Sequence, residues 1–466
     1  MVLVVDTSLC EAEQCGTPCL NICPQVKKGK AGISIRGEFA VISEKYCVEC
    51  LRCVEVCPTR AIKPKEVTGQ EHDTVHELVD QKLSDSQPKI AKLPFEMDND
   101  IYDQFGEYDT VFARVQWDTS FEGYQKEIFS RSKERASQGY DGYSEVELAA
   151  VQASWAVEDM VTHLEIGELK EGLVSPVEEK TTPMHDFTSK ELTQWVKKVA
   201  KVFGADLVGV TAFDPRWVYT NDRGGEEINL PDNLTFAVVI AVEMDLDAIN
   251  TSPKMPSGIA TGLGYSKSAF VRSLLTSFIR NMGYQAVPAG NQLGLSVPLA
   301  VMAGLGGYGR TGLLITKKFG PRVRLAKIFT DMPLIPDEPD HQFVHSVERF
   351  CKTCMTCAKA CPSASISMEK EPSYETYSKS NNPGVRKWYV NVDTCYQFWV
   401  ENGVECSRCI SDCEYNRTNR RTLGGHAVTM WLISHVPWLN RLWPLMGRVT
   451  GFGGNKSAKK YWREVK

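Results

Sequence analysis

The sixteen cysteines constrain this chain more than any other feature, because they form two blocks that lie far apart in the sequence. The first block occupies residues 10–57 and the second occupies residues 351–413. Each block divides into two groups of four cysteines. Four thiolates are a complete ligand set for one cubane iron–sulfur cluster, so the pattern predicts four 4Fe–4S clusters.

Two of the groups have the spacing C-x2-C-x2-C-x3-C-P, in the stretches CVECLRCVEVCP and CKTCMTCAKACP. This is the spacing of bacterial ferredoxins, in which three cysteines wrap one cluster and the fourth ligates the neighbouring cluster. Zinc sites favour two separated C-x2-C pairs instead. A disulfide framework is typical of small secreted domains, whereas this chain has 466 residues. We therefore interpret the cysteines as cluster ligands.

The ferredoxin pattern also predicts which cysteines share a cluster. Each predicted set takes three cysteines from one group and the last cysteine of the neighbouring group. Cys395 has the least regular spacing, because ten residues separate it from Cys406. The four sets are Cys10, Cys15, Cys19 and Cys57; Cys23, Cys47, Cys50 and Cys53; Cys351, Cys354, Cys357 and Cys413; and Cys361, Cys395, Cys406 and Cys409.

Net charge and hydropathy restrict which partners this protein can have and in which compartment it can work. The formal net charge is −5, which gives no electrostatic support for a nucleic-acid partner. The opening residues, MVLVVDTSLCEAEQCG, contain no basic segment, no long apolar run and no twin-arginine pair. No uninterrupted apolar stretch reaches the length of about 18 residues that a membrane span needs. We therefore expect a cytoplasmic protein.

The cysteine-free middle of the chain predicts a mixed α and β region. TSKE at Thr188 has the pattern of a capping box, and apolar residues then recur at helical spacing as far as Phe203. Gly204 follows as a plausible helix end. The apolar runs at 207–211 and 236–244 predict buried strands, and a second helix is expected over 266–282.

The stretch GLGGYG at 304–309 matches the G-x-G-x-x-G pattern of dinucleotide sites. That interpretation requires a strand immediately before the glycines, and the preceding SVPLAVMA does not clearly end a strand. We therefore prefer a different role for Gly304, Gly306 and Gly309, in which they let the backbone approach another large, flat cofactor.

Two parts of the chain resemble known protein families, and the first of them is the N-terminal part. Residues 1–65 resemble the iron–sulfur domain of the ribosome-recycling ABC ATPase, in the spacing C-x4-C-x3-C-x3-C-P and in ISEKYCVECLRCVEVCPTRAI. No G-x4-GK[ST] phosphate loop occurs in the chain, so only the cluster-binding role is carried over.

Residues from about 100 to 466 resemble the catalytic subunit of cobalamin-dependent reductive dehalogenases. The resemblance is carried by GADLVGVTAFDPRWVY, ATGLGYSKSAF, FIRNMGYQAVPAGNQLGLSVPLA and AGLGGYGRTGLLITKKFGPRVRLAKIFTDMPLIPD, followed by both C-terminal cysteine groups. It implies an α+β fold with a nitroreductase-like cobalamin-binding core and a C-terminal two-cluster ferredoxin-like module. The cobalt-ligating D-x-H-x-x-G pattern is absent, which agrees with the base-off cobalamin of that family.

The resemblance also implies the site residues. Tyr265 matches the proton-donating tyrosine, and Asn291 matches a residue that lines the pocket. A cation beside the tyrosine would stabilise the phenolate left after proton donation; the candidates, in order of preference, are Arg324, Arg310 and Lys327. Ser266 and the three glycines Gly304, Gly306 and Gly309 are the expected cofactor contacts. Two positions depart from the family pattern: Gly307 replaces an acidic residue, and Glu414 replaces a proline.

The function implied is reductive cleavage of a carbon–halogen bond in a small organohalide. Electrons from a soluble low-potential donor would enter at the N-terminal clusters and pass through the C-terminal pair to cobalamin, while Tyr265 donates the proton. One alternative is an enzyme like epoxyqueuosine reductase, whose R-x-D-Y-H type run is replaced here by GLGYSKS. The other is a non-catalytic electron carrier of the polyferredoxin type.

These observations divide the chain into five segments. They are a two-cluster ferredoxin domain (1–65), a polar linker (66–100), the cobalamin-binding domain (101–340), the two-cluster module (341–425) and a C-terminal segment (426–466). The last segment is rich in tryptophan, with Trp431, Trp438, Trp443 and Trp462. We expect it to pack on the core; docking on a membrane or a partner is the alternative.

Overall fold

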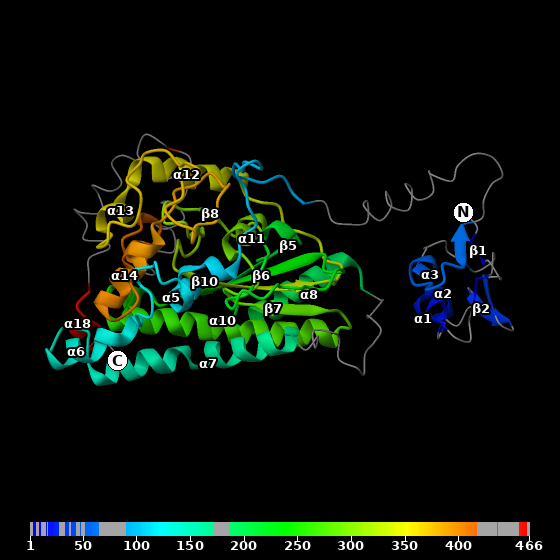
Figure 1. The fold of residues 1–466 in the computed structure, drawn as a ribbon, viewed down its shortest axis with the longest axis horizontal. Helices are drawn as coiled ribbons and strands as arrows, with labels where there is room; N and C mark the ends of the chain where they lie inside the picture. Colours follow the sequence, from blue (N-terminus) through cyan, green and yellow to red (C-terminus); the bar gives the residue numbers. More distant parts are fainter. Residues whose placement is uncertain are drawn as a thin grey trace. The chain divides into compact units, whose positions relative to one another are not determined.

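The computed structural model describes residues 3–5, 9–10, 15, 17–27, 33–36, 39–42, 47, 52–64, 90–170, 187–416, 436 and 456–463 (Figure 1). The chain divides into two compact units, Met1–Ser84 and Asp85–Lys466. The first unit contains the predicted ferredoxin domain. The second contains the mixed α and β region together with the second cysteine block.

Short elements around a cysteine-rich core make up the first unit. β1 pairs antiparallel with β4, and β2 pairs antiparallel with β3. The buried core includes Cys19 and Cys53 together with Ile33, Ala40 and Ile62. An apolar core of this size is small for independent stability, which fits a unit that completes its core with clusters. The elements are β1 (Leu3–Val5), α1 (Pro18–Ile22), α2 (Pro24–Lys27), β2 (Ile33–Arg36), β3 (Phe39–Ile42), α3 (Arg52–Glu55) and β4 (Ile62–Pro64).

An antiparallel four-stranded sheet forms the centre of the second unit. Its strand order is β5-β6-β10-β7, with β5 at Leu207–Ala212, β6 at Phe236–Glu243, β10 at Val323–Thr330 and β7 at Ala286–Ala289. The predicted strands at 207–211 and 236–244 are confirmed. They are recognisable because both faces of the sheet are covered, so β6 reads as an almost unbroken apolar run.

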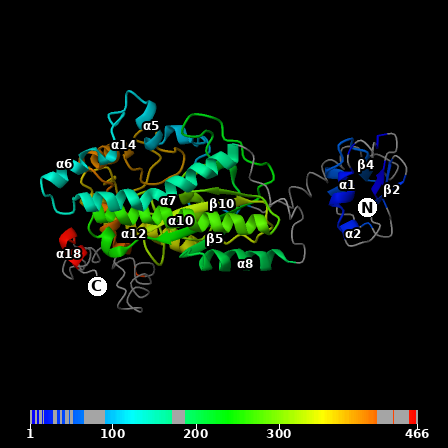
Figure 2. The ribbon, with the colours of Figure 1, turned by 90° about the horizontal axis from the view of Figure 1, so that it is seen from below.

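Helices cover both faces of this sheet. α8 (Ser189–Val202) and α10 (Met255–Asn281) pack on one face, and α11 (Ser296–Met302) packs on the other. Successive residues of β6 alternate accordingly: Val238 joins the core under α8 and α10, and Val239 joins the core under α11. α7 (Glu145–Lys170) runs alongside α10, as Figures 1 and 2 show.

The predicted capping box at the start of α8 is confirmed. The Thr188 side chain accepts a hydrogen bond from the Glu191 backbone, and the Glu191 side chain accepts one from the Thr188 backbone. The helix ends at Val202, and Gly204 follows in the left-handed region with φ of 114°. Only a residue without a Cβ adopts that conformation at no cost, so Gly204 acts as the predicted stop.

The structure confirms a helix in the predicted range 266–282. However, this helix, α10 (Met255–Asn281), begins eleven residues before the predicted start. The sequence there contains three glycines, which read as a turn. In the structure these glycines let neighbouring segments approach the helix. A Cβ at Gly262 would lie 2.2 Å from Ser154 Oγ of α7, and one at Gly258 would lie 2.6 Å from a methyl group of Val404. Tyr265 therefore sits in the middle of a helix and not in a loop.

The remaining described elements of the second unit surround the sheet and carry the second cysteine block. The first of them are η1 (Glu107–Asp109), α5 (Val111–Trp117), η2 (Ile128–Arg131), α6 (Ser132–Ser137), η4 (Pro215–Trp217) and α9 (Leu246–Ile249). Those from residue 307 onward are β8 (Gly307–Tyr308), β9 (Leu314–Ile315), α12 (His341–Cys354), α13 (Thr356–Ala360), α14 (Val392–Asn402), α15 (Arg408–Ser411), η5 (Glu414–Asn416) and α18 (Ala458–Arg463).

One expected segment boundary differs from the structure. The linker expected to reach residue 100 ends earlier, because Leu93, Phe95 and Met97 pack against the core of the second unit. The described part of the cysteine-rich segment, residues 341–416, belongs to the same compact unit as the sheet. Much of the segment 426–466, including Trp431, Trp438 and Trp443, lies outside the described residues.

The described end of the chain packs on the second unit. Ala458 of α18 is buried, and Trp462 Nε1 donates a hydrogen bond to Glu147 Oε1 at 2.7 Å. Among the described helices, none combines the length and the apolar character needed to cross a bilayer.

Candidate functional site

Tyr265 lies on α10 with its phenol oxygen held by two donors. Asn291 Nδ2 donates to Tyr265 Oη at 3.0 Å, and Arg324 Nη1 donates to the same oxygen at 3.4 Å. The Arg324 guanidinium also lies over the tyrosine ring, 4.6 Å from its centroid. Trp155 of α7 stacks against the ring at a centroid distance of 5.0 Å. Because Tyr265 Oη is the acceptor in both of these hydrogen bonds, its own proton is used in neither of them.

Strand alternation explains why Arg324, rather than Lys327, reaches this tyrosine. The two residues are three positions apart on β10, so their side chains point to opposite faces of the sheet. Arg324 faces α10, where Gly264 leaves room for it: a Cβ on that glycine would lie 3.0 Å from Arg324 Cγ. The structure thus brings together the predicted residues Tyr265, Asn291 and Arg324.

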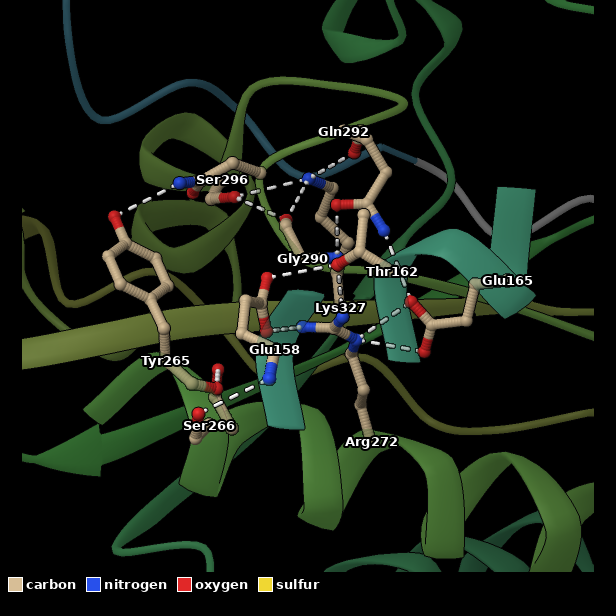
Figure 3. Close-up of polar contacts among 12 residues, drawn as sticks. Glu158, Thr162, Glu165, Tyr265, Ser266, Arg272, Gly290, Gln292, Ser296 and Lys327 are labelled. Atoms are coloured by element: carbon tan, nitrogen blue, oxygen red, sulfur yellow. Dashed lines mark hydrogen bonds and ion pairs between the residues drawn. The ribbon is translucent and has the colours of Figure 1, made fainter. Parts of the chain in front are cut away.

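Lys327 instead anchors the loop that carries Asn291 (Figure 3). Its Nζ donates to the carbonyl oxygens of Gly290, Gln292 and Gly294 at 2.7, 3.0 and 2.6 Å, and lies 3.2 Å from Ser296 Oγ. Burial lowers the pKa of Lys327 to about 7. These contacts fix the loop 290–296, so Lys327 positions Asn291 and does not itself contact the tyrosine.

A buried charge network supports the same loop from α7 (Figure 3). The side chain of Arg272, on α10, is fully buried; its Nε donates to both oxygens of Glu165 at 2.9 and 3.0 Å, and its Nη1 donates to Glu158 Oε2 at 2.9 Å. Glu165 also accepts from Gln292 Nε2 at 3.1 Å. Burial raises the pKa of Glu165, while the positive charge of Arg272 opposes that rise. The network links α7 and α10 to the residue next to Asn291.

The structure places the Ser266 hydroxyl between α10 and α7. Its Oγ donates to the Ser154 carbonyl at 2.7 Å and accepts from the Glu158 backbone at 3.2 Å. The hydroxyl therefore joins α10 to α7.

Replacing Ser266 by alanine should lower the free energy of unfolding by about 1 kcal/mol, because two hydrogen bonds between the helices are lost. Binding of any cofactor should not change. Urea unfolding checks the first expectation, with exposed Lys267→Ala as the control. If Ser266→Ala unfolds like Lys267→Ala but binds cofactor more weakly, Ser266 contacts the cofactor, as the sequence predicted.

The three predicted glycines pack against other parts of the chain, and Arg310 lies among backbone carbonyls rather than beside Tyr265. A Cβ at Gly304 would lie 2.8 Å from the Glu338 carbonyl oxygen, one at Gly306 would lie 2.2 Å from the Ile315 carbonyl oxygen, and one at Gly309 would lie 2.8 Å from the Ile315 side chain. The glycines are thus explained by packing within the chain. The segment before them is the helix α11 and not a strand, so the context of a dinucleotide site is missing. Arg310 bonds to carbonyls of the cysteine-rich segment and does not join Tyr265.

A cavity of about 320 Å³ adjoins the site, and Asn291 lines it. Two features of this Asn291 cavity call for a polar ligand. Trp217 lines it, and its buried indole N–H has no hydrogen-bond partner among the residues that the structure describes. Lys387 also lines it, stands 4.8 Å from the Tyr389 ring, and has no carboxylate within ion-pair distance among the described residues. Burial lowers the pKa of Lys387 to about 8. An unpaired cation in a cavity favours a ligand with negative charge.

Four cysteines of the C-terminal block line one further cavity. They are Cys351, Cys354, Cys357 and Cys413, the set that the ferredoxin pattern predicts. The other predicted set is also brought together, because Cys409 interacts electrostatically with Cys361, Cys395 and Cys406. Burial raises the pKa of Cys395 to about 12 and that of Cys406 to about 11. Thiolates in such surroundings require positive charge from a bound group.

In the first unit, Cys19 interacts with Cys15, Cys57 and Cys10, which again is a predicted set. Ala40 N donates to Cys10 Sγ at 3.3 Å. Of the second set, Cys23, Cys47 and Cys53 share the core of this unit, whereas Cys50 lies outside the described residues. The described cysteines are all free of disulfides. Within the described part of the chain, no His, Cys, Asp and Glu side chains converge on a point as for a single ion; a cubane is larger, so its ligands surround a cavity.

Comparison with known proteins connects this geometry to a family. Residues 40–63 match the 4Fe-4S binding domain family. Over 274 residues, half of this chain, the sequence is 40% identical to a tetrachloroethene reductive dehalogenase of Desulfitobacterium hafniense. It is 32% identical over 302 residues, or 58% of this chain, to the tetrachloroethene reductive dehalogenase of Sulfurospirillum multivorans. Over half or more of its length, this chain is similar to reductive dehalogenases. It spans 49% and 59% of these two relatives.

The fold agrees with the relationship to reductive dehalogenases. A solved reductive dehalogenase whose structure suggests a mechanism for B12-dependent dehalogenation superposes with a TM-score of 0.59 at 18% identity, covering 85% of this chain and 57% of that one. The epoxyqueuosine reductase of Listeria monocytogenes is a more limited match, 31% identical over 127 residues, which are 26% of this chain and 29% of that protein. The reductive dehalogenase relationship is therefore the more extensive of the two.

Proposed function

We propose that this chain is a cobalamin- and iron–sulfur-dependent reductase that cleaves the carbon–halogen bond of a small organohalide. The observation that carries the proposal is the Tyr265 oxygen held between Asn291 and Arg324, with Asn291 also lining a cavity. The relatives named above support the choice of reaction, since they are reductive dehalogenases.

We propose that the Asn291 cavity receives part of a corrinoid, because its volume of about 320 Å³ is smaller than the whole cofactor. Cobalamin is large and carries a phosphodiester in its nucleotide loop, and the unpaired cation of Lys387 fits that anionic group. Asn291, Ser296 and Lys387 would contact it within a nitroreductase-like core, with the base released from cobalt. When bound, the corrinoid supplies a strongly reducing cobalt centre that takes electrons to the carbon–halogen bond.

The residues around Tyr265 supply the proton that the reaction needs. Tyr265 gives the proton on Oη to the carbon from which halide leaves. Asn291 and Arg324 hold the resulting phenolate by a hydrogen bond and a positive charge, and Trp155 keeps the ring in place. Lys327 and the Arg272 network keep the loop 290–296, and hence Asn291, in position.

The cysteine sets provide the electron path. Sixteen cysteines in four sets would hold four 4Fe–4S clusters. We infer that the clusters of the first unit accept electrons from a soluble low-potential donor in the cytoplasm and pass them to the pair in the second unit.

Anaerobic turnover tests this function. The full chain, reconstituted with iron, sulfide and cobalamin, would be supplied with a low-potential reductant and screened against aryl and alkyl halides. We expect release of halide that depends on cobalamin and on intact clusters. If the fully loaded protein releases no halide above the cobalamin-only control from any of these compounds, the proposal is wrong.

A further inference from the structure

The cavity surrounded by Cys351, Cys354, Cys357 and Cys413 is also lined by several polar side chains, and two of them, which the mechanism does not use, are a cation and a phenol. They are Arg310, which precedes β9, and Tyr415, in η5. Both are almost completely buried, each with a relative exposure of 1%. Their position beside four potential cluster ligands suggests that they act on the cluster.

Arg310 is a fixed positive charge in this cavity. Its Nε and Nη2 donate to the Cys351 carbonyl at 3.2 and 2.7 Å, and its Nη1 donates to the carbonyls of Ser367 and Glu369 at 2.7 and 2.6 Å. The guanidinium lies 4.5 Å from the centroid of the Trp388 ring. No carboxylate forms an ion pair with it among the described residues. A buried, unpaired cation is costly, and burial accordingly lowers the pKa of Arg310. A negatively charged group in the cavity would remove that cost.

Tyr415 is a buried hydrogen-bond donor without an acceptor. Its ring is fixed by edge-on contacts with Phe350 and Phe343, at centroid distances of 5.2 and 6.3 Å. Its hydroxyl has no hydrogen-bond partner among the described residues. Buried hydroxyl groups almost always have a partner, so this one fits an acceptor that occupies the cavity, such as a cluster sulfur.

We propose that Arg310 and Tyr415 raise the reduction potential of the cluster held by Cys351, Cys354, Cys357 and Cys413. Reduction adds one electron to the cluster and breaks no bond, so the reduced cluster carries one more negative charge. The Arg310 cation and a hydrogen bond from Tyr415 Oη stabilise that charge more than they stabilise the oxidised form. Glu414 also lines the cavity, and its negative charge acts in the opposite direction. The inference rests on cluster binding as proposed above.

Redox titration of the reconstituted full chain, followed by electron paramagnetic resonance, tests this inference. Tyr415→Phe removes only the hydroxyl. It should make the equilibrium constant for reduction of one cluster about tenfold smaller, which for a one-electron couple is a decrease of about 59 mV. Arg310→Gln should lower the same potential further, and Arg310→Lys should restore part of it. Tyr389→Phe is the matched control, because its hydroxyl is also buried but donates to the Val385 carbonyl at 2.8 Å.

Iron content separates the possible outcomes. Unchanged potentials in Tyr415→Phe, at the same iron content as the parent chain, would overturn the inference while leaving cluster binding intact. An equal shift in the Tyr389→Phe control would overturn it as well. If the parent chain binds no cluster at these four cysteines, the proposed function fails and the inference fails with it. Because Arg310→Gln also removes bonds to three carbonyls, Tyr415→Phe is the decisive variant.

Discussion

Replacing Tyr265 by phenylalanine is expected to reduce halide release by about 10²- to 10⁴-fold, the range that a positioned general acid contributes. The variant retains the ring that stacks on Trp155 and loses only the hydroxyl that Asn291 and Arg324 hold. Bound cobalamin and iron should therefore equal those of the parent chain. Halide release and cofactor content would be measured on the same preparations.

A second tyrosine provides the control for this variant. Tyr143 is buried, and its hydroxyl donates to the Asn402 carbonyl at 2.9 Å, away from the Tyr265 site. Tyr143→Phe should keep nearly full turnover. If Tyr265→Phe releases halide as fast as Tyr143→Phe, the proton reaches the product by another route and the assignment of Tyr265 is wrong.

Arg272→Met is expected to have the largest effect on stability, lowering the free energy of unfolding by about 3–5 kcal/mol. The substitution leaves Glu158 and Glu165 buried without their cation. It also weakens the support of the loop that carries Asn291, so the variant should lose turnover as well. Urea unfolding of the variant and the parent chain measures the stability effect.

The loss of unfolding free energy caused by Arg272→Met should become smaller as the pH falls. Burial already raises the pKa of Glu165 above its usual value, and loss of the cation would raise it further. A carboxyl whose pKa is raised by folding favours the folded state below its unfolded pKa, and that contribution is lost as the pH rises through the folded pKa. The variant should therefore come closer to the parent chain in stability as the pH falls from 8 toward about 5.

An exposed pair is the matched control for Arg272. Lys170 bridges to Glu226 at the surface, where side-chain exposures are 53% and 70%, and exposed pairs contribute little. Lys170→Met should leave the unfolding free energy essentially unchanged. Equal effects of the two substitutions, or a cost for Arg272→Met that does not vary with pH, would contradict the role assigned to the buried network.

Short-range sequence patterns predicted one helix and two strands of this fold. The capping box at Thr188 and the stop at Gly204 fixed both ends of α8, and unbroken apolar runs located β5 and β6. Cysteine spacing predicted that Cys351, Cys354, Cys357 and Cys413 lie around one cavity, because a cubane imposes its own geometry on the chain that binds it. The family resemblance predicted that Tyr265, Asn291 and a cation lie together, and the period-two alternation on β10 explains why Arg324, and not Lys327, lies beside Tyr265.

Features that depend on tertiary contacts escaped prediction. Gly262 reads as a turn residue in isolation, and only the close approach of α7 explains a glycine inside α10. The pairing of Arg272 with Glu165 spans 107 residues and leaves no local pattern. Arg310 was the second candidate for the cation beside Tyr265, but it follows a short glycine-rich segment and donates to carbonyls of the cysteine-rich segment instead. Ser266 adjoins Tyr265 in sequence, yet it points to α7 because neighbouring helix positions face different directions.

We propose that the second unit holds a corrinoid beside Tyr265 and that the cysteines deliver electrons to it. The most direct test is the cobalt and iron content of the purified, reconstituted full chain, combined with electron paramagnetic resonance of the bound corrinoid. We expect one base-off cobalamin per chain together with iron for four 4Fe–4S clusters, and weaker corrinoid binding when Lys387 is replaced by methionine. A chain that takes up its full complement of iron but no corrinoid would contradict this proposal and identify an electron carrier instead.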